Sequence, residues 1–346
     1  MYEDYYHLSA KPFQLSPDPR FFFGSKGHKR AMAYLDYGLS LGEGFIVITG
    51  DVGAGKTTLV RNLFKQLERE NIIAAQLVST QLDAEDTLRS VAASLGLEHE
   101  GLNKSALLKN LEDYLNSASR QGKRVLLVVD EAQNLTARAV EELRMLSNYQ
   151  NNHNSLIQTF LLGQPEFRGI LQGADMQQLR QRVIASYQLG PLDADETRGY
   201  IEHRLNMVGW KGNPGFSDDA FALIHRFAGG IPRRINTFCD RLMLFGYLEE
   251  ISHFDEQQVN EVIEDLRNEV AHQESPVYAS APGIAGQGTA VLHTQESGVL
   301  AQRVEQIERS INRILPIVRK ILYMLSERNP VEEAVGPDSK DQPLPH

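Results

Sequence analysis

The sequence predicts an α/β fold in which a parallel sheet lies between helices, followed by a small all-α domain. Three observations carry this prediction. A glycine-rich segment, Gly50–Thr58, lies between an apolar run and a segment with helical periodicity. A second apolar run, Val125–Val129, ends in the carboxylates of Asp130 and Glu131. Strand-like and helix-like segments alternate as far as Pro191, as they do in chains that build parallel sheets.

The segment Gly50–Thr58 reads GDVGAGKTT, which is the spacing of a phosphate-binding loop. Its glycines let the backbone curl until successive N–H groups point at one anion, and the following helix adds its positive end. Lys56 can reach the outer phosphates, and the Thr57 hydroxyl can coordinate Mg²⁺. The residues expected to bind nucleotide here are Gly50, Asp51, Val52, Gly53, Ala54, Gly55, Lys56, Thr57 and Thr58.

Asp130 and Glu131 follow a run of five apolar residues, which predicts a central strand buried on both faces. Ligands bind at the carboxyl edge of open α/β sheets, where this strand would deliver its two acids. We therefore expect Asp130 and Thr57 to hold Mg²⁺, and Glu131 to polarise an attacking water with Lys56 nearby.

Three further polar residues are candidates for catalysis. Gln164 follows an expected strand over Leu156–Leu162, and it either contacts the γ-phosphate and its water or is an ordinary loop amide. Arg180 and Arg182 either reach a neighbouring subunit's nucleotide, where they would stabilise charge in phosphoryl transfer, or form surface ion pairs.

Residues 191–270 are expected to be helical throughout. The start signals of four helices are Asp193, Ser217, Pro232 and Asp255. At the third start lies GGIPRRIN, where Arg233, or its neighbour Arg234, can lean over bound phosphates and couple the nucleotide to this domain. The expected boundaries are therefore an α/β domain over 1–190 and a helical lid over 191–270.

The two ends of the chain have distinct compositions. Residues 1–23 are rich in aromatics and prolines, and they either pack against the core or cover the nucleotide base. Residues 271–298 have the small-residue composition of a flexible linker, and 329–346 that of a disordered tail.

Residues 299–328 are expected to form an amphipathic heptad helix. Its apolar positions alternate in steps of 4 and 3: Leu300, Val304, Ile307, Ile311, Ile314, Val318, Ile321 and Leu325. A helix face this apolar needs a partner. That partner can be a second copy of this chain, a groove on another protein or a membrane surface.

Composition narrows the class of protein. At 346 residues, 42% hydrophobic and 23% charged, the chain is expected to be globular with room for two domains. A net charge of −10 argues against broad contact with nucleic acid. No signal peptide is expected, and no segment reaches the roughly 18 apolar residues of a membrane span. We expect a cytoplasmic protein that can act at the surface of the inner membrane.

Several motifs together resemble the AAA+ ATPases of the general secretion pathway protein A type. They are the phosphate-binding loop, VVDEAQNL at 128–135, LLGQPEF at 161–167, GGIPRRIN at 229–236 and the aromatic N-terminal segment. The subgroup encoded with exosortase and exopolysaccharide systems is the most similar. The resemblance covers about residues 1–270.

This resemblance implies a P-loop NTPase (AAA+) fold and hydrolysis of ATP with Mg²⁺. It implies Gln164 as sensor 1, Arg182 in preference to Arg180 as the arginine finger, and Arg233 as sensor 2. It also implies an ATP-dependent homo-oligomer that works on envelope secretion or polysaccharide-export proteins. The family prototype continues into a membrane-spanning helix and a peptidoglycan-binding region, and we expect neither in residues 271–346.

Two other functions remain possible from the sequence. One is a DNA-directed ATPase of the transposition-helper type, whose ATPase core is similar, and the other is a scaffold that binds ATP and hydrolyses it slowly. GTP is not the expected nucleotide, because no NKxD motif follows the second acidic strand, and Asn103–Ala106 lacks the aspartate.

Overall fold

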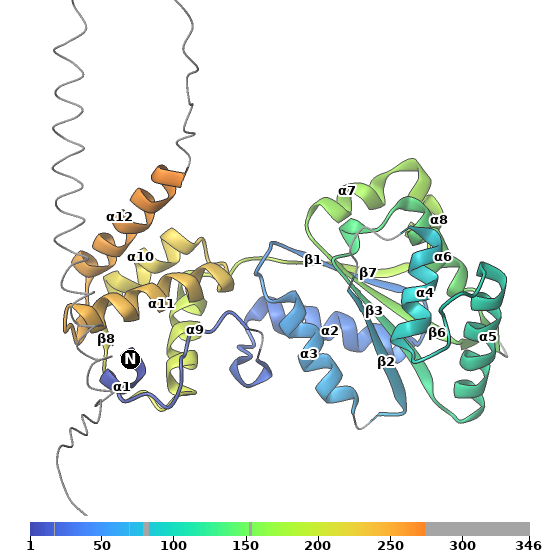
Figure 1. The fold of residues 1–346 in the computed structure, drawn as a ribbon, viewed down its shortest axis with the longest axis horizontal. Coiled ribbons are helices and arrows are strands. Elements are labelled where there is room, and N and C mark those ends of the chain that lie inside the picture. Colours follow the sequence, from blue (N-terminus) through green and yellow to red (C-terminus); the bar gives the residue numbers. More distant parts are fainter. Residues whose placement is uncertain (17, 69, 79–82, 152–153, 274–346) are drawn as a thin grey trace, which may run out of the picture. The chain divides into compact units, whose positions relative to one another are not determined.

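A parallel sheet of five strands, in the order β2-β3-β6-β1-β7, forms the centre of the first domain in the computed structural model (Figure 1). The structure describes residues 1–16, 18–68, 70–78, 83–151 and 154–273. The strands are β1 (Phe45–Gly50), β2 (Ile72–Val78), β3 (Arg124–Asp130), β6 (Ile157–Gly163) and β7 (Val183–Leu189). The apolar runs of β1, β2, β3 and β6, the second of them at Ile72–Val78, predict strands from the sequence alone, whereas β7 was not expected.

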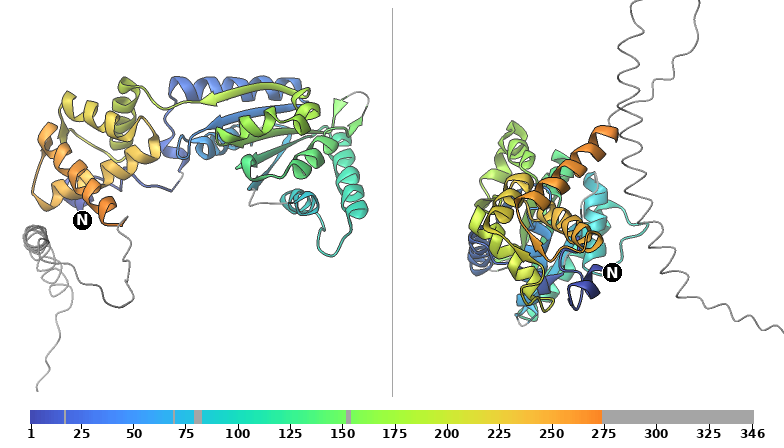
Figure 2. Two further views of the ribbon diagram at one scale, coloured as in Figure 1. Left: turned by 90° about the horizontal axis from the view of Figure 1, so that it is seen from above. Right: turned by 90° about the vertical axis from the view of Figure 1, so that its left-hand side faces the viewer.

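The sheet buries both faces because successive side chains of a strand point to opposite sides. In β1, Phe45 and Val47 join one apolar cluster, while Ile46 and Ile48 join the other. The two faces are covered by different helices, as Figure 2 shows from above: α2 and α3 on one side, and α4, α5 and α6 on the other. Burying each such aliphatic side chain stabilises the fold by about 1.5–3 kcal/mol.

Several helices of this domain begin directly after a residue whose side chain caps them. Their bounds are α2 (Lys26–Leu41), α3 (Lys56–Leu67), α4 (Ala84–Ser94), α5 (Lys104–Arg120), α6 (Ala137–Leu146), α7 (Glu166–Gln172) and α8 (Gln177–Arg180). Ser25, Asp83, Asn103 and Thr136 each accept a backbone N–H of the helix that they precede, a contact that stabilises a helix by about 1 kcal/mol. Short connecting elements are β4 (Gln150–Asn151), β5 (Asn154–Ser155) and the 3-10 turns η2 (Ala132–Asn134) and η3 (Ala174–Met176).

The lid follows β7. It contains α9 (Ala194–Asn206), α10 (Asp218–Ala228), α11 (Pro232–Leu248) and α12 (Glu256–Gln273), each starting where the sequence signals place it. The expectation of helices alone was incomplete, because β8 (Gly215–Phe216) and β9 (His253–Phe254) form a short parallel pair between the helices.

The N-terminal segment packs with the helices of the lid. It contains α1 (Tyr2–Tyr5) and η1 (Pro19–Phe21). The rings of Tyr2, Tyr6, Phe13 and Phe21 are buried in the lid's apolar cluster. Arg204 of α9, itself buried, donates to the carbonyls of Pro12 at 2.6 Å and Gln14 at 3.2 Å, so the segment is fastened to the lid along its length.

The expected linker, heptad helix and tail at 271–298, 299–328 and 329–346 lie outside the described residues, apart from residues 271–273 at the end of α12. Among the helices of the described ranges, none is long and apolar enough to cross a membrane.

Candidate nucleotide-binding site

The phosphate-binding loop joins β1 to α3 and makes the turn that its glycines allow. Gly53 and Gly55 have φ angles of 84° and 100°, which L side chains rarely adopt. Gly55 is the N-cap of α3, so this helix begins at Lys56 and directs its N-terminus at the loop. The arrangement is that of an anion-binding site.

Lys56 is buried beneath the loop. Its ammonium donates to the carbonyls of Gly50 at 2.7 Å and Asp51 at 3.1 Å, and burial lowers its pKa. Glu131, Asp130 and Asp51 oppose this shift by favouring the charged form. The lysine is therefore held by neutral oxygens at the position from which it can reach an incoming phosphate.

Thr57 and Asp130 meet at the same edge of the sheet, with the Thr57 hydroxyl donating to Asp130 at 3.0 Å. Burial raises the pKa of Asp130, although the hydrogen bonds from Thr57 and from the Glu131 backbone act in the opposite direction. Burial therefore outweighs these two bonds and the nearby ammonium of Lys56, which also favours the ionised form. A hydroxyl and a carboxylate are ligands that Mg²⁺ accepts, so these two residues fit the expected metal site.

Glu131 lies just beyond β3 with a φ of 55°, an unusual conformation for a residue other than glycine. Its carboxylate accepts hydrogen bonds from the side-chain amides of Gln133 at 2.6 Å and Gln164 at 3.2 Å. Burial is the largest influence on the pKa of Glu131 and would raise it, but these two bonds and Lys56 lower it overall. The carboxylate is thus held ionised beside the loop.

A cleft opens between the loop, the N-terminal segment and the lid. From the loop it is lined by Val52, Gly53, Gly55, Lys56, Thr57 and Thr58, together with Glu131. From the N-terminal segment and α2 it is lined by Gln14, Leu15, Ser16, Asp18, Phe21, Phe22, Phe23 and His28. From the lid and the chain leading to it, it is lined by Leu192, Tyr200, Arg204, Pro232, Arg233 and Asn236.

Arg233 is the lid residue that touches the loop. Its backbone N–H donates to the carbonyl of Gly53 at 3.2 Å, and its side chain lines the cleft. Arg234, the alternative from the sequence, is exposed and does not line this cleft. Of the two arginines, both exposed, only Arg233 lines this cleft.

Gln164 is not among the residues that line the cleft. Its side chain contacts Glu131, and its backbone N–H donates to the side chain of Gln133 at 2.9 Å. Of the roles left open from the sequence, this geometry favours orientation of the water through Glu131.

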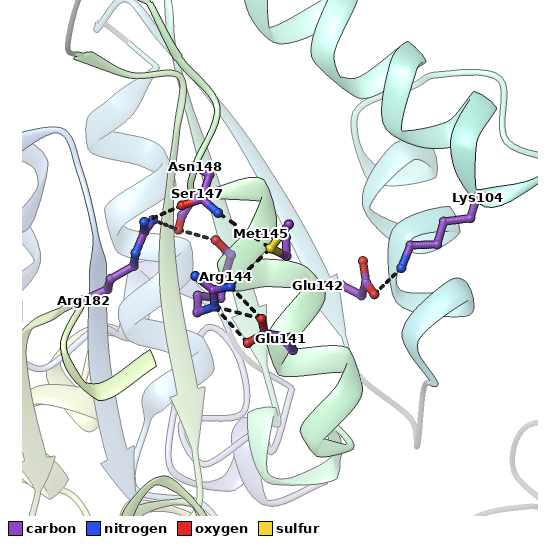
Figure 3. A network of polar contacts seen from close by, with 8 residues as sticks. All are labelled: Lys104, Glu141, Glu142, Arg144, Met145, Ser147, Asn148 and Arg182. Atoms are coloured by element: carbon purple, nitrogen blue, oxygen red, sulfur yellow. Dashed lines mark hydrogen bonds and ion pairs between the residues drawn. The ribbon is translucent and has the colours of Figure 1, made fainter. Parts of the chain in front are cut away.

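Arg182 lies at the start of β7, where its carbonyl accepts from the N–H of Phe45 at the start of β1. The loop follows the far end of β1, about 16 Å away at the rise of a strand. Arg182 is therefore remote from its own nucleotide site. Its guanidinium donates to Ser147 at 2.6 Å and to Asn148, at the end of α6 (Figure 3).

Arg180 forms hydrogen bonds within its own chain. Its guanidinium donates to the carbonyls of Leu171 at 2.5 Å and Gly173 at 2.7 Å, at the end of α7. It thus satisfies carbonyls that the helix leaves unpaired.

Four residues of the cleft were not expected from their sequence signals. His28 is buried, contacts the loop backbone at Ala54 and meets Phe22 edge to face, while burial lowers its pKa. Arg204 donates to the Tyr200 hydroxyl at 2.8 Å, which donates to Asn236 at 2.9 Å. One feature of the sequence could have indicated the pair in α9: Arg204 follows Tyr200 by four residues, so the two side chains lie on the same side of the helix.

Comparison with known proteins agrees with this geometry. Residues 40–171 match the family model described as an AAA domain. Over 288 residues, 81% of this chain, the sequence is 36% identical to general secretion pathway protein A of Aeromonas hydrophila and covers 52% of it. The chain thus spans about half the length of this curated relative.

Solved structures are similar at low sequence identity. CDC6P from Pyrobaculum aerophilum has a TM-score of 0.60 at 16% identity, covering 73% of this chain and 70% of its own. The ORC2 protein of Aeropyrum pernix has a TM-score of 0.57 at 16% identity, covering 74% and 72%. The protein therefore has the AAA P-loop NTPase fold, as the sequence predicted.

Proposed function

We propose that this protein is a Mg²⁺-dependent ATPase that energises or remodels an envelope secretion or polysaccharide-export assembly. One observation carries the catalytic part: the loop with Lys56 and Thr57 faces Asp130 and Glu131 at one edge of the sheet, with Arg233 of the lid against it. The sequence relative named for general secretion supports the second part.

In this proposal the phosphates of ATP lie on the N–H groups of the loop, and the ammonium of Lys56 exchanges its two carbonyl contacts for phosphate oxygens. Thr57 and Asp130 would hold Mg²⁺, which supplies charge neutralisation on the phosphate oxygens. Glu131 orients a water for in-line attack on the γ-phosphorus, and the bond to the bridging oxygen of ADP breaks. Arg233 balances charge from the lid side.

We further propose that Arg182 acts on the nucleotide of a neighbouring subunit in an ATP-dependent homo-oligomer. Its place at the opposite end of β1 from the loop supports a role in trans, because it is too far from its own site. The segment 299–328 would contribute to assembly, to a partner protein or to contact with the inner membrane. The protein would act on the cytoplasmic side of that membrane.

The first test is ATP turnover by the full chain. We expect phosphate release with ATP and Mg²⁺ that is lost with a chelator, with Lys56→Ala and with Glu131→Gln, while Glu131→Gln still binds ATP. Equal turnover by the wild type and Glu131→Gln would reject this assignment. Salt-dependent stimulation by duplex DNA would favour the DNA-directed alternative instead.

The second test is assembly, measured by light scattering in the Glu131→Gln background with and without ATP and Mg²⁺. We expect a nucleotide-dependent increase in mass for the full chain. The same measurement on a chain ending at Gln273 shows whether the segment beyond α12 is required. A monomer under every condition would contradict the proposed role of Arg182 in trans.

A further inference from the structure

Gln133 connects two parts of the site, the carboxylate of Glu131 and the end of β6. It lies in η2, two residues after Glu131, and its amide contacts both the Glu131 carboxylate and the first residue beyond β6. It belongs to the motif VVDEAQNL, in which only Asp130 and Glu131 were expected to act.

The orientation of the Gln133 amide follows from its partners. The backbone N–H of Gln164 can only donate, so the atom that it contacts at 2.9 Å must be the oxygen Oε1 of Gln133. The nitrogen Nε2 therefore points to Glu131, where it donates to Oε2 at 2.6 Å. This bond is short because its acceptor is charged.

The backbone makes room for this bridge at Gly163, the last residue of β6. A Cβ at this position would lie 3.2 Å from Oε1 of Gln133 and 3.1 Å from Cβ of Phe167. Both distances are tighter than ordinary contacts, so the absence of a side chain lets Gln133 approach the strand end.

Both amides bind the same oxygen of the carboxylate. Gln133 and Gln164 each donate to Oε2 of Glu131, which fixes the plane of a side chain that otherwise rotates freely. The other oxygen, Oε1, can then accept from a water in the cleft that Glu131 lines.

We propose that Gln133 is a positioning residue: it holds Oε2 of Glu131 so that Oε1 meets the attacking water, and it ties this carboxylate to the end of β6. The proposal rests on the ATPase function proposed above. Because Gln133 joins Glu131 to the Gln164 backbone, a displacement of the β6 end reaches the carboxylate through one side chain.

Two substitutions in the full chain separate the contacts. Gln133→Glu retains an oxygen for the Gln164 N–H but replaces the donor to Glu131, and Gln133→Met removes both contacts at similar volume. Gln121→Met, at an exposed position before β3, is the matched control. Melting temperatures identify any variant that fails to fold.

The first readout is the steady-state rate of ATP hydrolysis at one fixed pH. For both Gln133 variants we expect kcat to fall by about ten- to a hundredfold, the size of one charge-assisted hydrogen bond, with KM for ATP within about twofold. Gln121→Met should change neither constant. An unchanged kcat, or a rise in KM as large as the fall in kcat, would overturn the proposal.

The second readout does not require turnover. The carboxyl carbon of Glu131, assigned by the disappearance of its signal in Glu131→Gln, is observed by NMR at neutral pH in glutamate-labelled protein. We expect its chemical shift to change in both Gln133 variants and to stay the same in Gln121→Met, and an unaltered shift would overturn the proposal. If the wild type does not hydrolyse ATP, the ATPase assignment fails, and this signal still decides whether Gln133 binds Glu131.

Discussion

The backbone N–H of Arg233 donates to the carbonyl of Gly53 across 3.2 Å, so the first turn of α11 rests directly on the phosphate-binding loop. The contact is close: a Cβ on Gly53 would come within 2.3 Å of Cβ of Arg233. The loop and the lid cannot move independently at this point, and a ligand that reshapes the loop therefore acts on the lid.

We expect Gly53→Ala to weaken ATP binding at least tenfold. The added methyl group collides with Arg233, and the φ of 84° is unfavourable for alanine. The matched control is Gly122→Ala, at a φ of 71° with no atom within 4 Å of the new methyl group. Binding of a fluorescent ATP analogue should fall in Gly53→Ala alone, and equal losses in both variants would show that backbone strain, not Arg233, is responsible.

Arg233→Ala should reduce ATP affinity by about tenfold or more, since it removes a charged donor that lines the cleft. Arg234→Ala is the paired variant: the side chain is adjacent and exposed but lies outside the cleft. Isothermal titration with ATP and Mg²⁺ distinguishes them. A larger loss of ATP affinity in Arg234→Ala than in Arg233→Ala would show that Arg234, not Arg233, contacts the bound phosphates.

Asp130→Asn should raise the melting temperature of the nucleotide-free protein at neutral pH. The folded-state pKa of Asp130 lies above its ordinary value, so its contribution is favourable at low pH and is lost as the pH rises through that pKa. The same variant should lose the stabilisation that Mg²⁺ and ATP give together. Asp113→Asn, at an exposed position on α5, should change neither quantity, and a lower melting temperature in Asp130→Asn would contradict this account.

His28 should make stability depend on pH. Burial lowers its pKa below the ordinary 6.5, so the folded state binds this proton less readily than the unfolded chain. Its contribution is complete above about pH 6.5 and falls as the pH decreases through the folded-state pKa. His28→Gln, which keeps a donor for the loop, should therefore lose less stability than the wild type between pH 7.5 and 5.

The control for this pH dependence is His253→Gln, at an exposed position of β9. Burial also lowers the pKa of His203, so some pH dependence should remain in His28→Gln. Thermal melts at each pH measure the effect. If the melting temperatures of His28→Gln and the wild type change in parallel with pH, His28 does not contribute to the pH dependence of stability.

Arg182→Ala should abolish turnover while ATP binding remains within about twofold, if Arg182 acts on a neighbour's nucleotide. Ser147→Ala removes one contact that holds Arg182 within its own chain and should leave turnover nearly unchanged. When Arg182→Ala and Glu131→Gln subunits are mixed, activity should return only at sites where the intact Glu131 of one subunit meets the intact Arg182 of its neighbour. Equal losses in Ser147→Ala and Arg182→Ala would indicate a structural role.

Short-range patterns in the sequence were enough to predict several parts of this protein. The loop Gly50–Thr58 was visible because its glycines, lysine and hydroxyl are contiguous. β3 with Asp130 was visible because a strand buried on both faces is continuously apolar. The lid helices were visible because each begins at a recognisable cap or proline.

The strand β7 was missed because it lies at the edge of the sheet and carries a mixed sequence, VIASYQL, with no strong period. Other features are contacts between distant segments, which no local pattern encodes. The tertiary structure alone placed the N-terminal rings in the lid, His28 under the loop and Arg233 on Gly53. It alone also joined Gln133 to Gln164, because these two residues meet only once β3 and β6 are paired.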